Sequence, residues 1–219
     1  MRASDLTYLL PELILLGGAA LVLLLDLVWA RRAGEPRGRL LPYVALAVLF
    51  FAALGLIPSI GANVSVATML VLDPFALFFK AFALLAVALI ILLSTPYMQT
   101  RTPFSGEFYA FLLATALAIC LAVSASNLVM IYLSMEFLSI TSYVLAGYFR
   151  QDRKSGEAAL KYFLYGSTAS AVMLYGMSLL YGATGTTDLA GLAAGLSTSA
   201  AGQSAWLLTP AIVLLLAGF

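Results

Sequence analysis

One carboxyl group in the middle of an apolar stretch is the first candidate for chemistry in this sequence. Glu136 lies in "NLVMIYLSMEFLSITSYVLAGYF", residues 127–149, which otherwise reads as a single apolar helix. At 1.5 Å per residue the two ends of this stretch are roughly 14 and 20 Å from Glu136. A charged side chain at that depth in a membrane costs roughly 3 kcal/mol or more. We therefore expect Glu136 to have a function.

Hydroxyl groups share the predicted helix face with this carboxyl. Tyr132, Ser139 and Tyr143 stand at positions i−4, i+3 and i+7 from Glu136. Hydroxyls can donate to a carboxylate and hold water near it, and acids inside a membrane often mark ion pathways. The pattern predicts a site of proton uptake and release. The structural alternative is a polar clamp to a neighbouring helix.

The next predicted helix carries a second polar stripe. Its members share one face and are Glu157, Lys161, Tyr165, Thr168 and Tyr175. Glu157 and Lys161 are spaced to form an i, i+4 pair, and Lys161 lies roughly 6 Å from the helix end, where a lysine can also snorkel to water. Because Glu136 is about 14 Å deeper, coupling through water or hydroxyls is expected rather than a direct salt bridge.

Composition places these stripes in a membrane protein. The 219 residues are 63% hydrophobic and 10% charged, with a mean hydropathy of +1.04, whereas a soluble domain is nearer one quarter charged. We predict an all-α polytopic helix bundle forming a single transmembrane domain over 1–219. About seven spans are expected, at 6–29, 40–60, 74–98, 107–125, 127–149, 157–183 and 205–219. The last run is still apolar where the sequence stops, which suggests part of a longer polypeptide.

Four other charged residues in these spans have simpler interpretations. Asp26 and Glu12 lie near the two ends of the first helix, and Asp73 precedes Pro74 as a helix-entry residue. Lys80 is two turns into its helix and is expected to snorkel outward.

Basic residues predict the orientation. The connections 30–39, 99–106 and 150–156 hold eight arginines and lysines, whereas the opposite side has Arg2 alone. The positive-inside rule places these loops in the cytoplasm and the N-terminus outside. The connection 184–204 has no basic residue and is expected to be an extramembrane connector with a short amphipathic turn.

Several classes of site are excluded by what the sequence lacks. It has no histidine, a single cysteine, Cys120, and no glycine-rich phosphate loop. We expect this chain to bind no NADH, flavin, iron–sulfur cluster, haem or metal, and no nucleic acid.

The stretch "MEFLSITSYVLAGYFRQDRKSGEAALKYFLYGSTASAVMLYGMSLLYGATGTTDL", residues 135–189, resembles subunit N of bacterial respiratory complex I, the proton-pumping NADH:quinone oxidoreductase. "LLPELILLGGAALVLLLDL" and "LDPFALFFK" are similar to that family too. The resemblance implies an antiporter-like fold of two inverted repeats in about twice this length, so the chain would stop before the second repeat. It carries the family's central proton-pathway glutamate over to Glu136 and its membrane lysine to Lys161.

The expected function is therefore proton translocation by a non-redox subunit of a respiratory NADH:quinone oxidoreductase in the bacterial inner membrane. Quinone and NADH would react in other subunits, and the partners would be antiporter-like paralogues, small membrane subunits and lipid. Residues expected to line or hydrate the route are Tyr132, Ser139, Tyr143, Tyr165 and Thr168. Two alternatives are a cation/proton antiporter subunit and a purely structural membrane scaffold.

Overall fold

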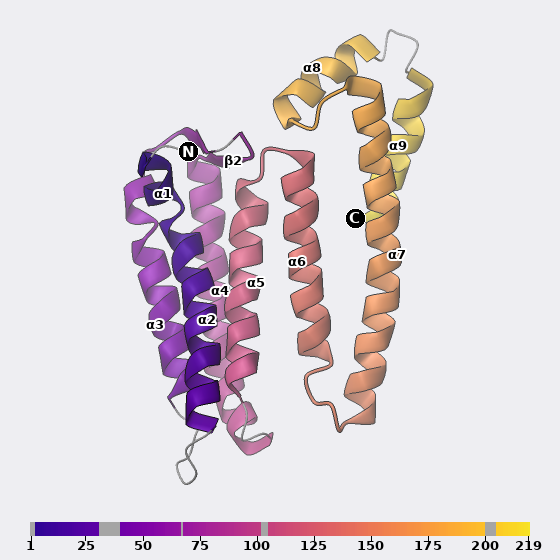
Figure 1. Ribbon diagram of the computed structural model, residues 1–219. Coiled ribbons are helices and arrows are strands. Elements are labelled where there is room, and N and C mark those ends of the chain that lie inside the picture. Colours follow the sequence, from indigo (N-terminus) through magenta and orange to yellow (C-terminus); the bar gives the residue numbers. More distant parts are fainter. Residues whose placement is uncertain (1–2, 31–39, 67, 102–104, 200–204) are drawn as a thin grey trace. The chain divides into compact units, whose positions relative to one another are not determined.

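The computed structural model describes residues 3–30, 40–66, 68–101, 105–199 and 205–219, and most of them are helical (Figure 1). Within these ranges, six stretches are long and apolar enough to cross a membrane, which confirms the predicted all-α membrane fold. The elements are, in chain order, α1 (Ala3–Tyr8), α2 (Leu10–Ala30), α3 (Leu41–Leu54), η1 (Ile57–Ser59), β1 (Val64–Val66), β2 (Leu70–Leu72), α4 (Pro74–Arg101), α5 (Gly106–Ser124), α6 (Leu128–Ala146), α7 (Arg153–Thr184), α8 (Leu189–Ser199) and α9 (Ala205–Gly218).

The described residues differ from the predicted spans at three places. The seventh predicted span, 205–219, is the 14-residue helix α9, which is shorter than the roughly 20 residues that a bilayer core needs. The predicted connector 184–204 contains a full helix, α8. The segment before the third span contains the two-stranded sheet β1–β2, which apolar run lengths do not predict. Most of the basic connection 30–39 lies outside the described residues.

Helix starts follow the local sequence. Pro42 stands in the first turn of α3, where its missing N–H removes no helix hydrogen bond. Asp73 accepts from the Ala76 amide at 2.7 Å, as expected of a helix-entry residue. Asn127 caps α6 by accepting from an amide two residues on, and Asp152 caps α7 in the same way.

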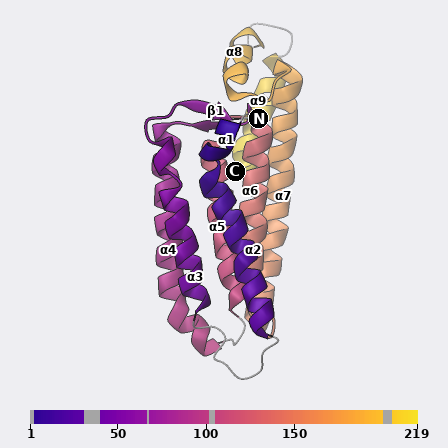
Figure 2. The same ribbon diagram turned by 60° about the vertical axis from the view of Figure 1, so that its left-hand side comes forward.

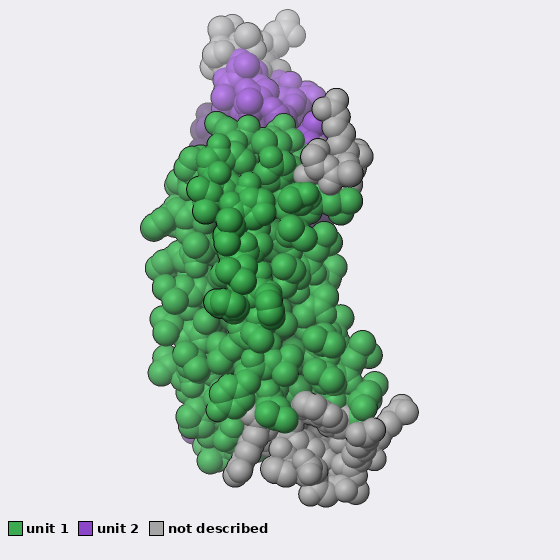
Figure 3. Space-filling view, turned by 90° about the vertical axis from the view of Figure 1, so that its left-hand side faces the viewer, with its two compact units in different colours: residues 1–67, 71–124 green, residues 68–70, 125–219 purple. Residues whose placement is uncertain are grey.

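Contacts along the chain form two compact units, coloured separately in Figure 3. Unit 1 comprises residues 1–67 and 71–124, and unit 2 comprises residues 68–70 and 125–219. In unit 1, α2 packs against α3 and α5, and α4 packs against the same two helices (Figure 2). Its core includes Leu15, Val48, Val87 and Leu113.

Unit 2 is built on α7, which packs against α6, α8 and α9. A buried cluster joins these helices and consists of Leu128, Met173, Met177, Leu180, Leu192 and Ala211. Gly176 permits the close approach of α9, because a Cβ there would lie 2.9 Å from the carbonyl oxygen of Ala211. Asn127 joins the start of α6 to the segment before α8, since its side-chain amide donates to Thr187 at 2.9 Å.

Candidate functional site

The carboxyl group of Glu136 occupies the middle of α6, within unit 2. The helix runs from Leu128 to Ala146, so roughly 12 and 15 Å of helix separate Glu136 from its two ends. The residue is half-buried. Its Oε1 atom is buried and has no hydrogen-bond donor among the described residues. An unpartnered buried carboxyl oxygen is a feature that a native fold usually explains by water or by function.

Tyr132 is the side chain that the structure brings to this carboxyl. It lies one turn earlier on α6, interacts with the charge of Glu136 and hydrogen-bonds to its side chain. The neighbourhood predicted from the i−4 spacing is therefore present. The ring of Tyr132 also packs against the buried cluster of unit 2, which fixes the tyrosine next to the acid.

Tyr143 shows which way this face of α6 points. Its ring makes edge-on contacts with Tyr162 and Phe163 of α7, at centroid distances of 4.8 and 5.8 Å. A Cβ added at Gly166 would overlap the Tyr143 hydroxyl. Glycine at this position therefore makes room for the hydroxyl between the two helices, and the polar face of α6 is turned toward α7.

Other hydroxyls of α6 are directed to their own helix. Ser134, Thr141 and Ser142 each donate to a backbone carbonyl three or four residues earlier. Ser139, predicted to line the route, is half-buried. The polar contact to Glu136 thus comes from Tyr132.

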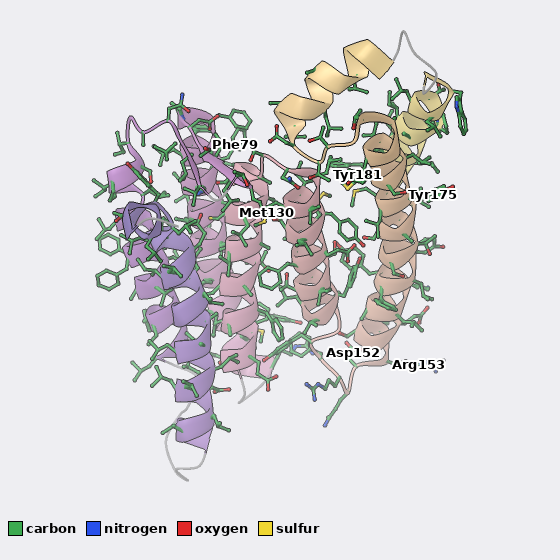
Figure 4. All side chains as sticks on the ribbon, turned by 45° about the horizontal axis from the view of Figure 1, so that its top comes forward. Phe79, Met130, Asp152, Arg153, Tyr175 and Tyr181 are labelled. Atoms are coloured by element: carbon green, nitrogen blue, oxygen red, sulfur yellow. The ribbon has the colours of Figure 1, made fainter. Side chains whose placement is uncertain are left out.

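The second predicted stripe lies on an exposed face of α7. Lys161 pairs with Glu157 at 2.6 Å, as their spacing predicts, but the two side chains are 66% and 57% exposed. Tyr165 is exposed, and the Thr168 hydroxyl donates to its own helix at 2.9 Å. Tyr175, labelled in Figure 4, is exposed as well. The residues of α7 that contact Tyr143 are on a different face, so within unit 2 this stripe is not gathered around Glu136.

Sequence reasoning missed a buried ion pair in unit 1. The Lys80 ammonium lies 2.7 Å from Oε1 of Glu12, and the two side chains are 1% and 7% exposed. Lys80 therefore does not snorkel, contrary to the expectation. Helices α2 and α4 begin at the same end of unit 1 (Figure 1) and both pack against α3 and α5, which brings the two charges together. A signal was present: both residues lie near a helix start that contains a proline, Pro11 or Pro74, and their charges are opposite.

Metal-binding chemistry finds little support in the part of the chain that the structure describes. No group of three or more Cys, Asp or Glu side chains there could hold a metal ion, and Cys120 is buried as a free thiol. The expectation that this chain binds no cofactor stays a prediction.

Comparison with known proteins bears on the family and the fold of the chain. Residues 125–219 match a family described as "NADH:quinone oxidoreductase/Mrp antiporter, TM". Subunit N of the NADH-quinone oxidoreductase of Anaeromyxobacter sp. is 44% identical over 195 residues, which are 89% of this chain and 37% of that protein. The corresponding subunit of Trichlorobacter lovleyi is 38% identical over 220 residues, covering 100% of this chain and 44% of the relative.

Solved structures share the fold. A chain of respiratory complex I from Thermus thermophilus superposes with a TM-score of 0.73 at 30% identity, over 95% of this chain and 42% of that one. A chain of the Mrp complex from Dietzia sp. has the same TM-score at 23% identity, over 95% and 23% of the two chains, and shows the fold alone.

The chain spans less than half of the length of these curated relatives. Nevertheless the alignment with the Trichlorobacter lovleyi subunit extends over the whole of this chain. The sequence resemblance and the helical fold agree, and residues 125–219 of the chain belong to the family of membrane subunits shared by NADH:quinone oxidoreductases and Mrp antiporters.

Proposed function

We propose that this chain is the part of a proton-translocating subunit of an NADH:quinone oxidoreductase that holds its central proton carrier, Glu136. The observation that carries the proposal is the carboxyl in the middle of α6, with a buried Oε1 atom lacking a described donor and a hydrogen bond to Tyr132. The similarity to relatives named subunit N supports the choice of enzyme.

The mechanism is electrostatic. A proton reaches Glu136 through water or hydroxyls, with Tyr132 as the adjacent hydroxyl, and leaves when the charge nearby changes. Lys161 supplies a charge nearer one end of α7 and acts as a relay. Tyr143 and Ser139 hydrate or line the route beside Glu136, and Tyr165 and Thr168 line it beside Lys161 on the exposed face of α7. Quinone reduction in partner subunits would supply the free energy, and no electron would pass through this chain.

The assembly would lie in the bacterial inner membrane beside the other membrane subunits of the complex. The basic connections 30–39, 99–106 and 150–156 would face the cytoplasm and the N-terminus would face the outside. Exposed apolar side chains on the helices, such as Phe78, Leu93 and Leu216, suit contact with lipid or with those subunits.

The test is the substitution Glu136→Gln in the assembled complex, with Glu136→Asp as the matched control that keeps a carboxyl group. We expect both variants to assemble and to oxidise NADH with an artificial electron acceptor. In sealed membrane vesicles only the glutamine variant should lose proton pumping coupled to quinone reduction. Unchanged pumping in that variant would refute the role of Glu136 and leave a structural scaffold as the remaining interpretation.

A cation/proton antiporter subunit is the second candidate, favoured by the scope of the matched family, which includes Mrp antiporters. It predicts proton flux that depends on sodium or potassium in vesicles given no NADH. Cation-dependent proton flux that is lost in Glu136→Gln would support the antiporter. It would also show that proton transport by this chain does not depend on electron transfer.

A further inference from the structure

Unit 1 holds a carboxyl group that is almost fully buried, that of Glu12. Glu12 on α2 and Lys80 on α4 form an ion pair in which both side chains are almost fully buried. Neither oxygen of the Glu12 carboxyl has an aligned hydrogen-bond donor among the described residues. Oε1 is held by the charge of Lys80 at 2.7 Å, and Oε2 has no described partner.

Further unpartnered polar atoms lie at the end of unit 1 that carries η1, which we call the η1 end. The hydroxyl of Ser59, in η1, and that of Ser124, the last residue of α5, are buried without a described partner. Ser124 stands one turn beyond Cys120 on the same face of α5. Buried polar atoms that no protein group satisfies are usually hydrated. The η1 end therefore has the polar groups that water needs to reach the ion pair.

The opposite direction is apolar. From Lys80 along its own helix face, the buried residues at i+4, i+7 and i+11 are Leu84, Val87 and Ile91. No polar side chain occurs on α4 until Ser94, roughly 21 Å further along the helix. Along α4 the pair is therefore separated from the far end of unit 1 by apolar side chains, and the orphaned oxygens of Glu12 lie closer to the η1 end.

Few other ionisable groups act on the pair. Cys120 of α5 interacts electrostatically with both Glu12 and Lys80. Of the helices packed against α2, α3 has Tyr43 as its ionisable residue, at its far end and exposed, α1 has Asp5 and the half-buried Tyr8, and α5 has Glu107 and Tyr109 in its first turn, away from the η1 end. Immediately before α4, the half-buried Asp73 stands two turns from Lys80. The charge state of Glu12 thus depends chiefly on Lys80 and on protons from water.

We propose that the Glu12–Lys80 pair is a second protonatable site of this chain, which exchanges protons with the membrane side at the η1 end and not with the other side. A proton from water binds the Glu12 carboxylate and leaves Lys80 as a free ammonium, and its loss restores the pair. The site is a half-channel that ends at the pair. The inference rests on none of the roles proposed for Glu136.

The test measures the protonation of Glu12 in the wild-type protein, so it needs no variant to fold. Dicyclohexylcarbodiimide reacts with protonated carboxyl groups in apolar surroundings, and mass spectrometry of the peptide containing Glu12 gives the extent of reaction. Sealed vesicles carrying the assembled complex are held at different pH values on each side in turn. A cysteine introduced by Ile60→Cys, at an exposed position beside η1, identifies the η1 side through its reaction with an impermeant maleimide.

We expect labelling of Glu12 to rise as the pH on the η1 side falls, by up to about tenfold per pH unit, and to be insensitive to the pH on the other side. In Lys80→Met, labelling should be strong across the whole range, because the carboxyl has lost its cation. A wild-type protein left unlabelled at every pH while Lys80→Met reacts would overturn the proposal and leave a fixed structural pair. Labelling that follows the pH of the opposite side would overturn it too.

Discussion

Removing one member of the Glu12–Lys80 pair should destabilise unit 1 strongly, while removing both should not. At 2.7 Å and an effective dielectric constant of 20, the gross attraction is about 6 kcal/mol. Part of that is lost to desolvation, and breaking a buried pair by deleting one partner typically costs about 3–5 kcal/mol. Replacing both partners by neutral groups of similar size is often close to neutral. We therefore compare Glu12→Gln, Lys80→Met and the double variant.

In each single variant the remaining residue can lose its charge by gaining or losing a proton. The free energy of that change sets an upper limit on the stability lost through the substitution. At pH 7, forcing a glutamate to keep its proton costs about 4 kcal/mol, and forcing a lysine to lose its proton costs about 5 kcal/mol. The cost of Lys80→Met should therefore shrink as the pH falls, because protonation in water becomes easier. The cost of Glu12→Gln should shrink as the pH rises. The two variants thus have opposite pH dependences.

Cys120 offers a local assay, because it is the single cysteine of the chain, fully buried, and next to the pair. The rate at which Cys120 of a variant reacts with N-ethylmaleimide is divided by the wild-type rate at the same pH. This ratio reports the change in the free energy of opening of unit 1. Each single variant should raise that rate by about two to three and a half orders of magnitude, and the double variant by far less. Glu157→Gln, in unit 2, is the control. A double variant as reactive as the single ones, or parallel pH slopes for the two singles, would refute this reasoning.

Three smaller effects are expected in unit 2. Gly166→Val should displace the Tyr143 ring and destabilise the contact between α6 and α7 by about 1–3 kcal/mol, measured by detergent unfolding; unchanged tyrosine fluorescence would contradict it. Asn127→Ala removes a helix cap and a side-chain bond, so amide hydrogen exchange at the start of α6 should become faster by a factor matching about 1–2 kcal/mol. Lys161→Met should change stability by less than about 1 kcal/mol, because its partner Glu157 is exposed, and a larger loss in thermal unfolding would argue for a buried role.

Hydropathy and helix-start residues predict most of the helices, because each is decided locally. Run length alone locates α4 and α5, and Asp73 marks the start of α4 through its own side chain. The short helix α9 and the sheet β1–β2 are not predictable in this way, since their lengths depend on packing against other elements. The closeness of α9 to α7, for example, requires the absence of a side chain at Gly176.

In the candidate site, likewise, contacts within one helix are predictable from the sequence and contacts between helices are not. Tyr132 and Glu136 stand one turn apart on one helix, so helix geometry predicts their contact, and the structure contains it. Gly166 and Tyr143 belong to different helices, and nothing in the spacing of either shows that they meet. The prediction that Lys80 snorkels outward was wrong. A depth of two turns allows a lysine to snorkel, but burial is decided by a partner 68 residues away in the sequence, and depth carries no information about it.

The carboxyl groups of Glu12 and Glu136 are compensated in different ways, and this difference bears on which of them can carry protons across a membrane. Glu12 faces an ammonium group 2.7 Å away, so the cation of Lys80 favours the charged carboxylate over the protonated carboxyl. Glu136 has a tyrosine hydroxyl instead, which can donate to a carboxylate or accept from a protonated carboxyl. In its own unit the predicted relay lysine is paired with Glu157 on an exposed face. A hydroxyl therefore suits both charge states of Glu136, as a carrier requires, whereas the environment of Glu12 suits a terminal site. A proton that reaches Glu12 has an apolar core ahead of it and must return the way it came.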